Sequence, residues 1–136
     1  MKFPKSDSTP LIRTDFASDK AWARVVEAAS AASPEGFRAN LHILDDPCFE
    51  NVDSATLAEA ASVAGDHALL IIADTSTMNN ADMPLLCVDT VSLGGQFRVV
   101  PKHLWGVENN VSLANMDFSE YAAAVDRYGV FRGFND

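Results

Sequence analysis

Apolar and polar positions along the chain fall into short runs that predict strands and helices in alternation. Apolar runs bounded by turn residues predict five strands, at residues 11–16, 39–44, 68–73, 85–91 and 97–100. The third run, ALLIIA, is apolar at every position, which is typical of a central strand buried on both faces. Gly94 and Gly95 separate the last two strands and predict a hairpin.

Helices are predicted between the strands by the three-and-four spacing of apolar positions and by capping residues. Ser18 is the expected N-cap of a first helix that runs to about residue 32, and Asp53 or Ser54 that of a second helix ending at residue 64. Gly65 follows the second helix, where a left-handed residue commonly ends a helix.

The last third of the chain predicts two more helices. Pro101 can begin a short helix, since proline is favoured at the first helical position. Asp117 and Glu120 have the spacing of a capping box, which predicts a helix over residues 118–128 that Gly129 ends. Residues 74–82 are largely polar and are predicted to form a loop.

The order of these elements predicts a single α/β domain. Three strands joined by helices are expected to be parallel, because such crossovers are right-handed connections within one sheet. The hairpin adds antiparallel strands, so we predict a mixed sheet flanked by three main helices. We assign residues 1–10 to a flexible N-terminal arm and residues 11–136 to the domain, with the apolar tail 130–134 docked on the core.

The net charge of the chain restricts the kinds of molecule that it can bind. The 136 residues include 19 Asp and Glu against 10 Lys and Arg, a net charge of −9. Such a chain repels phosphate backbones and anionic lipids, so we expect no nucleic-acid or membrane partner and favour a protein partner, in particular a basic one. The chain begins without an apolar signal segment, and Cys48 and Cys87 lack the spacing of a disulfide framework. Both features predict a cytoplasmic protein with free thiols.

Four aspartates follow predicted parallel strands and form a candidate acidic pocket. They are Asp15, Asp45, Asp46 and Asp74. Because ligands bind beyond the carboxyl ends of parallel strands, these carboxylates could hold a hard cation or act as general acid and base. The alternative is structural, since aspartate is common where strands end and its side chain accepts hydrogen bonds from nearby backbone.

Common catalytic and cofactor signatures do not occur in the sequence. His42, His67 and His103 are scattered, and neither cysteine has the context of a reactive thiol. The chain has no G-x-S-x-G elbow and no phosphate-binding G-x-x-x-x-G-K-[ST] loop. We therefore predict no nucleophilic triad, no histidine metal site and no cofactor.

A second candidate site is the segment around Trp105. Trp105, Glu108, Asn109 and Asn110 are expected in a loop, where they could form a recognition surface. The alternative places Trp105 in the core and the two asparagines in a turn.

Several short strings along the chain resemble a known family. They are RTDF (13–16), DDPCF (45–49), FRVVP (97–101), VENN (107–110), ANMDF (114–118) and VFRGF (130–134). In this order they are similar to a bacterial, mainly actinobacterial, family of small proteins classed as a domain of unknown function. The resemblance covers nearly the whole chain from residue 10. It implies a single domain and a bacterial origin, and it implies no catalytic residue.

Three functional hypotheses follow. The first is a non-enzymatic protein-interaction module, which by analogy shares its acidic profile with accessory and toxin-neutralising immunity proteins. The second is a metal- or small-molecule-binding enzyme that uses the four aspartates. An acidic mimic of nucleic acid is the third, although the acids do not form long runs.

Overall fold

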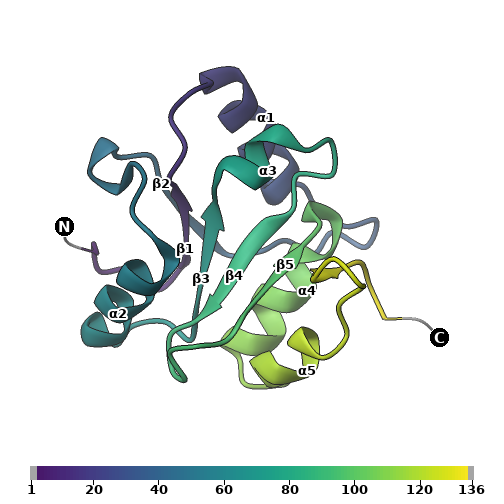
Figure 1. Ribbon diagram of the computed structural model, residues 1–136. Coiled ribbons are helices and arrows are strands. Elements are labelled where there is room, and N and C mark those ends of the chain that lie inside the picture. Colours follow the sequence, from purple (N-terminus) through teal and green to yellow (C-terminus); the bar gives the residue numbers. More distant parts are fainter. Residues whose placement is uncertain (1–2, 135–136) are drawn as a thin grey trace.

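Six strands form one mixed sheet in the order β2-β1-β3-β4-β5-β6 (Figure 1). The computed structural model describes residues 3–134. The strands are β1 (Thr9–Arg13), β2 (Leu41–Leu44), β3 (Leu69–Ala73), β4 (Leu85–Asp89), β5 (Gln96–Val99) and β6 (Val130–Phe131). The helices are α1 (Asp19–Ser30), a 3-10 turn (Pro47–Phe49), α2 (Ser54–Ala64), α3 (Thr75–Asn79), α4 (Pro101–Ser112) and α5 (Phe118–Ala122).

Strand directions in the sheet confirm the predicted α/β class. β1 is parallel to both β2 and β3, β3 is antiparallel to β4, and β4 is antiparallel to β5. β6 adds a short parallel pairing at the outer side of β5. The carboxyl ends of β1, β2 and β3 therefore lie at one edge of the sheet, and the turn between β4 and β5 lies at the opposite edge.

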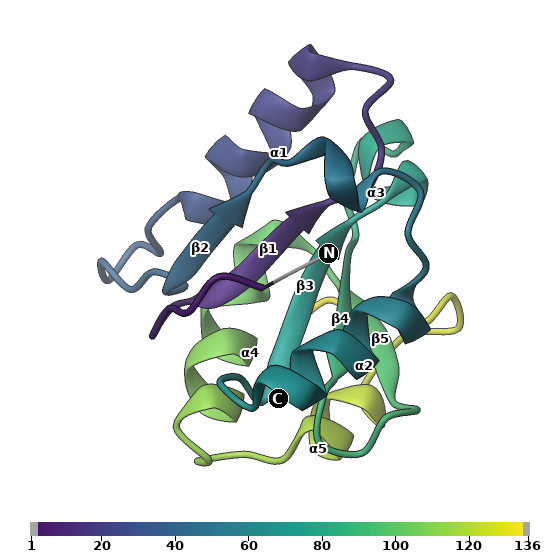
Figure 2. The same ribbon diagram turned by 90° about the vertical axis from the view of Figure 1, so that its left-hand side faces the viewer.

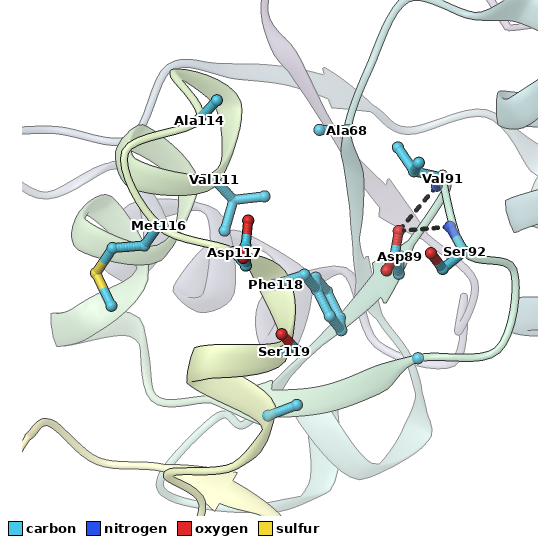
Figure 3. A pocket seen from close by; sticks show the side chains of 12 residues that line it. Ala68, Asp89, Val91, Ser92, Val111, Ala114, Met116, Asp117, Phe118 and Ser119 are labelled. Atoms are coloured by element: carbon cyan, nitrogen blue, oxygen red, sulfur yellow. Dashed lines mark hydrogen bonds between the residues drawn. The ribbon is translucent and has the colours of Figure 1, made fainter.

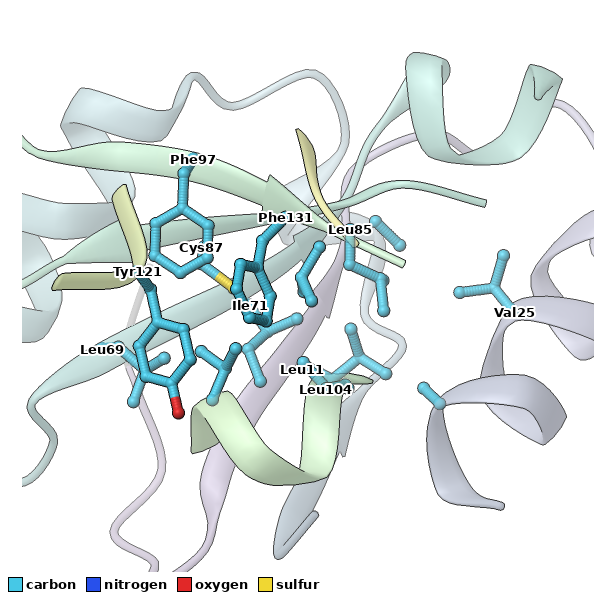
Figure 4. Close-up of a cluster of buried hydrophobic side chains, with 14 of the residues drawn as sticks. Leu11, Val25, Leu69, Ile71, Leu85, Cys87, Phe97, Leu104, Tyr121 and Phe131 are labelled. Atoms are coloured by element: carbon cyan, nitrogen blue, oxygen red, sulfur yellow. The ribbon is translucent and has the colours of Figure 1, made fainter. Parts of the chain in front are cut away.

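Side chains that alternate along the strands build a core on each face of the sheet. Leu11 and Ile71 point to the face covered by α1, α4 and α5, and Figure 4 shows them among Leu104, Tyr121 and Phe131. Their sequence neighbours, including Ile12 and Ile72, point to the other face and pack under α2. Figure 2 shows α2 in front of the sheet, with α1 and α4 behind it.

Predicted capping residues fix the ends of the two long N-terminal helices. The Ser18 side chain accepts a hydrogen bond from the Ala21 N–H, and the Asp53 side chain accepts one from Thr56. Gly65 ends α2 with φ = 74°. A positive φ costs little at glycine because it has no Cβ, which explains why the helix stops at this residue.

The first strand begins earlier than predicted. β1 starts at Thr9, so the last two residues of the expected arm 1–10 belong to the sheet. Pro10 lies inside the strand opposite His42, although proline cannot donate to a ladder. The ladder from β1 to β3 begins at Leu11, so the missing N–H of Pro10 lies outside it. Flexibility of the remaining arm stays a prediction, and residues 1–2 lie outside the described part.

Two local predictions in the C-terminal half are wrong. The expected loop 74–82 contains α3, because Asp74 and Thr77 form a capping box that starts a helix. The helix expected over 118–128 ends at Ala122. It stops because the Asp126 carboxylate accepts hydrogen bonds from the N–H groups of Tyr128 and Val130, which hold the backbone in a turn.

The C-terminal tail packs on the domain, as its apolar composition predicts. β6 pairs with β5, and Phe131 is buried. Gly133 then passes close to α4, where a Cβ would lie 2.8 Å from Nε2 of His103. Only a glycine permits this approach together with its φ of 105°.

Within the described part of the chain, no helix combines the length and the apolar character needed to cross a bilayer. Cys48 is exposed, Cys87 is buried, and both are free thiols, as predicted.

We predict that the centre of the sheet dominates stability. Replacing Ile71, which is fully buried, by alanine should lower the free energy of unfolding by about 3 kcal/mol, because it removes buried carbon atoms and leaves a cavity. Val63→Ala, at a position that is 84% exposed on α2, is the control and should change it by less than about 0.5 kcal/mol. Urea unfolding measures both, and equal effects would contradict this assignment of the core.

Candidate functional site

The four predicted aspartates all lie at the carboxyl-end edge of the parallel strands, but each has its own partner. Asp15 accepts a hydrogen bond from the Ala17 N–H, and Asp46 accepts one from the Cys48 N–H. Asp45 and Asp74 instead form ion pairs with two different arginines. The edge is therefore divided into separate local interactions.

Arg13 organises the first half of this edge from the end of β1. Its guanidinium is 3% exposed and pairs with Asp19 at 2.8 Å and with Asp45 at 3.2 Å. Burial by itself would lower the pKa of Arg13, but the hydrogen bonds and charges of both aspartates outweigh it and raise the pKa. The guanidinium also lies 4.3 Å from the ring centre of Phe16. These contacts tie the loops after β1 and β2 to the start of α1.

Asp74 and Arg98 organise the other half. The two oxygens of Asp74 accept hydrogen bonds at 2.9 and 2.7 Å from the two terminal nitrogens of Arg98, which extends from β5 across β4. Burial alone would raise the pKa of Asp74, yet the paired Arg98 and the Thr77 hydrogen bonds hold that pKa below its usual range. This bidentate pair connects the end of β3 to β5.

A small polar hollow of about 250 Å³ opens at the same edge. Thr14, Asn51, Ser54 and Asp74 are among its lining residues, and Asp74 is the only one of the four predicted aspartates there. Across residues 3–134 no three His, Cys, Asp or Glu side chains are grouped so that they could hold a metal ion. The aspartates thus lie at one edge without forming one pocket.

The loop predicted for Trp105, Glu108, Asn109 and Asn110 is wrong, because all four residues lie in α4. Adjacent asparagines such as Asn109 and Asn110 are common in turns. The helix forms because its buried residues recur at helical spacing, and tertiary packing outweighs the weak local propensity. They are Leu104, Val107, Glu108 and Val111.

Glu108 is a buried carboxylate that joins α4 to two strands. It is 2% exposed, and its oxygens accept hydrogen bonds from the Thr9 hydroxyl at 2.8 Å, the Asn40 N–H at 2.6 Å and the Ser112 hydroxyl at 2.7 Å. The Asn109 amide also donates to it at 3.3 Å. These donors replace water around the carboxylate and give it a positioning role.

The asparagines after Glu108 also bond within the domain. The Asn109 side chain donates to the carbonyls of Trp105 and Arg38, and the Asn110 side chain donates to the Tyr121 hydroxyl. Trp105 is half-buried, like the two asparagines, and its ring stacks on Phe37 with the ring centres 5.1 Å apart. Trp105 is the one of the four that presents an aromatic ring in place of a hydrogen-bonded polar group.

A groove at the opposite edge of the sheet was not predicted. We call it the basal groove, a hollow of about 520 Å³ between the β4–β5 turn and the α4–α5 connection (Figure 3). Its lining includes the apolar side chains of Ala68, Val91, Val111 and Phe118. Figure 3 shows Phe118 between the turn that carries Val91 and the segment that carries Val111.

Two carboxylates lie among the apolar residues of the basal groove. Asp89 ends β4, and its Oδ1 accepts hydrogen bonds from the N–H groups of Val91 at 2.8 Å and Ser92 at 3.0 Å. Asp117 starts α5 in the predicted capping box with Glu120. No lysine or arginine of residues 3–134 lines this groove, so its potential is negative.

Exposed aliphatic side chains surround the basal groove. Val91 is 76% exposed, and Leu93 and Leu113, which stand next to lining segments, are 56% and 69% exposed. The lining comes from several separate segments, which sequence patterns do not bring together. The available signal was the pair Val91 and Leu93, because a polar Gly-rich turn does not ordinarily carry two large aliphatic residues.

The mixed six-stranded sheet and its surface hollows define a small α/β domain. Most charged side chains at the carboxyl-end edge of its parallel strands form ion pairs or hydrogen bonds within the domain. The family described as a domain of unknown function (DUF6924) matches residues 8–134, and the chain belongs to this family. This agrees with the family resemblance of the sequence strings. No curated protein matches the chain.

We predict that the Asp74–Arg98 pair stabilises the fold in a pH-dependent way. Because the pKa of Asp74 is lowered in the folded state, the pair contributes stability above about pH 4 and loses it as the pH falls through the lowered pKa. Asp74→Asn should therefore be less stable than the wild type at neutral pH, and the difference should shrink on acidification. Urea unfolding across this pH range measures it.

Asp82→Asn is the control for that experiment. Asp82 also pairs with an arginine, Arg132, but the two side chains are 58% and 46% exposed, so solvent screens the pair. Its removal should change the free energy of unfolding by less than about 0.5 kcal/mol. If the difference in the free energy of unfolding between the wild type and Asp74→Asn did not change with pH, the stabilising role of the Asp74–Arg98 pair would be contradicted.

We also predict that Glu108 acts through its hydrogen bonds. Glu108→Ala should lower the free energy of unfolding by about 3 kcal/mol, because it leaves buried donors on β1 and before β2 without an acceptor. Glu108→Gln should cost about 1 kcal/mol, since its carbonyl can still accept from Asn40 and the hydroxyls can reverse. Urea unfolding of the two variants tests this, and equal losses would contradict it, because glutamine keeps the shape and one acceptor oxygen that alanine lacks.

Proposed function

We propose that the protein is a non-enzymatic interaction module that binds a basic protein partner through the basal groove. The observation that carries this proposal is the combination of an apolar lining, two carboxylates and exposed aliphatic side chains around one hollow. Exposed apolar patches rimmed by polar groups are typical of protein-binding surfaces.

Charge favours a basic segment as the occupant. Asp89 and Asp117 line the groove, and no lysine or arginine of residues 3–134 does so. The net charge of the whole chain is −9. A lysine or arginine of a partner would gain electrostatic attraction here, and the overall charge would speed its approach. An acidic partner or nucleic acid would be repelled.

Size and lining favour side chains of a polypeptide. A hollow of about 520 Å³ has room for large apolar side chains. Phe118 and Val111 offer an apolar floor, and Val91, Leu93 and Leu113 can exclude water from the contact. Burial of apolar groups would then supply affinity, and the carboxylates would select basic flanking residues.

The proposal includes a location in the bacterial cytoplasm. Free thiols at Cys48 and Cys87 suit a reducing compartment. Accessory and immunity-like proteins remain the nearest functional analogy, because they also work by covering a partner.

The test compares two sets of labelled peptides that share large apolar residues and differ in their flanks, lysine and arginine in one set and glutamate in the other. Fluorescence anisotropy should detect binding of the basic set, and this binding should weaken as salt rises. Asp89→Asn should weaken it roughly fivefold, about 1 kcal/mol, while its amide oxygen still accepts the backbone hydrogen bonds of the turn.

Asp15→Asn is a matched control for Asp89→Asn. Asp15 has the same chemistry, with Oδ1 accepting the N–H two residues later at 2.8 Å, but it lies at the opposite edge of the sheet. The Asp15→Asn substitution removes the same charge and should leave the affinity for the basic peptides nearly unchanged. Equal binding of both peptide sets, or an equal loss of peptide affinity in both variants, would show that the basal groove is not the binding site.

A further inference from the structure

The outer strand β2 has one side without a neighbouring strand. It stands at the end of the sheet order and pairs only with β1, and Figure 2 shows it as the outermost strand on its side. The strand at the other end of the sheet is β6, which has two residues and is flanked by Gly129 and Gly133, both with positive φ. β6 therefore offers little backbone to a further strand, whereas β2 offers four residues.

The ladder between β1 and β2 determines which backbone groups of β2 face outward. The Thr9 N–H donates to the Asn40 carbonyl at 2.8 Å, and Thr9 stands opposite Leu41. Alternate residues of a strand bond to the neighbour on one side, so His42 faces β1, while Leu41 and Ile43 direct their N–H and C=O groups outward. Within residues 3–134 these four outward groups take part in no hydrogen bond.

The sequence of β2 does not protect this open side. Free edge strands are ordinarily protected against further strands by charged side chains, proline or a bulge. The sequence of β2 is LHIL, which has no Asp, Glu, Lys, Arg or Pro, and its ladder with β1 continues without a bulge to Leu44. The side chains of Leu41, His42 and Ile43 are half-buried, so apolar surface remains beside the open backbone groups. A further strand would cover both.

We infer that β2 receives an extended segment of a partner protein, which adds a seventh strand to the sheet. The outward N–H and C=O groups of Leu41 and Ile43 bond to the backbone of this segment, which is the chemistry of β-strand addition. Side chains of the segment alternate between the two faces of the sheet. Apolar residues at every second position extend the core on the face where Leu41 and Ile43 already pack.

Charge at the carboxyl end of β2 favours a basic residue at the adjoining end of the segment. Asp46 and Glu50 follow the strand, are exposed and form no ion pair within residues 3–134. A lysine or arginine that extends past Leu44 gains electrostatic attraction there. The basal groove lies elsewhere, at the β4–β5 turn, so binding at β2 goes beyond the function proposed for that groove.

The test uses a labelled peptide of alternating valine and threonine that ends in lysine, together with two N-methylated isomers of it. One isomer is methylated at odd positions and the other at even positions, so each loses backbone donors and keeps every side chain. Because only alternate residues of an added strand face β2, one isomer should bind like the parent peptide and the other at least about tenfold more weakly in fluorescence anisotropy. Equal affinity of the two isomers, or no binding of the parent peptide at about 1 mM, would overturn the inference.

Amide hydrogen exchange, followed by NMR, gives a second readout. In the free protein the amides of Leu41 and Ile43 should exchange fast, and those of His42 and Leu44, which face β1, should exchange slowly. The parent peptide should slow exchange at Leu41 and Ile43. If it does not, the segment does not bind at β2. Protection of these two amides that rises with protein concentration without peptide would assign the site to a second copy of the chain and overturn the inference.

Ile43→Pro tests the same contact from the protein side. It removes one outward N–H and leaves the bonds to β1 in place, since proline is tolerated where the N–H of an edge strand faces solvent. Affinity for the parent peptide should fall at least about fivefold, with the fold checked by circular dichroism and thermal unfolding. Ile43→Thr keeps the N–H and is the matched control, so equal affinity of the two variants would contradict binding at β2. Neither variant should change binding of basic peptides at the basal groove, so the two proposals can fail separately.

Discussion

β3 is buried on both faces and paired on both sides, and the other elements are arranged around it. All five of its residues are buried, with β1 parallel on one side and β4 antiparallel on the other. A strand of this kind needs apolar cover above and below. α4 and α1 supply it on one face and α2 on the other. Because β4 must run antiparallel, its turn to β5 lies at the edge opposite the aspartates, and this places the basal groove.

Buried charges in this domain are met by specific partners. Arg13 is enclosed by Asp19 and Asp45, and Glu108 by hydroxyl and amide donors. Removing a charge from water is costly, so such groups persist only where hydrogen bonds and opposite charges replace the lost hydration. As a result, most charged side chains at the carboxyl-end edge hold strands and helices together. Apolar surface that the rest of the domain does not cover lies elsewhere, at the basal groove and on α4.

Much of the fold could be predicted because its signals are local. The ALLIIA run, the caps at Ser18 and Asp53 and the stop at Gly65 each act within a few residues. The extent of α4 could not be predicted, since it depends on the packing of Val107 and Glu108 against strands far away in sequence. The division of the aspartate edge depends on Arg98, which lies 24 residues after Asp74 and reaches it only once β4 and β5 have paired.

The same distinction explains why the predicted site residues and the proposed binding surfaces differ. Sequence reasoning selected polar residues that gather at strand ends, and the folded chain uses many of these to bond itself. Surfaces for partners are formed instead by apolar residues that folding leaves uncovered, and their character follows from the charges nearby. Among residues 3–134, Asp89 and Asp117 are the only charged side chains that line the basal groove, and their negative charge suits a basic segment. A chain that carries −9 therefore keeps apolar surface open to a basic partner at an edge where no lysine or arginine of residues 3–134 lines the groove.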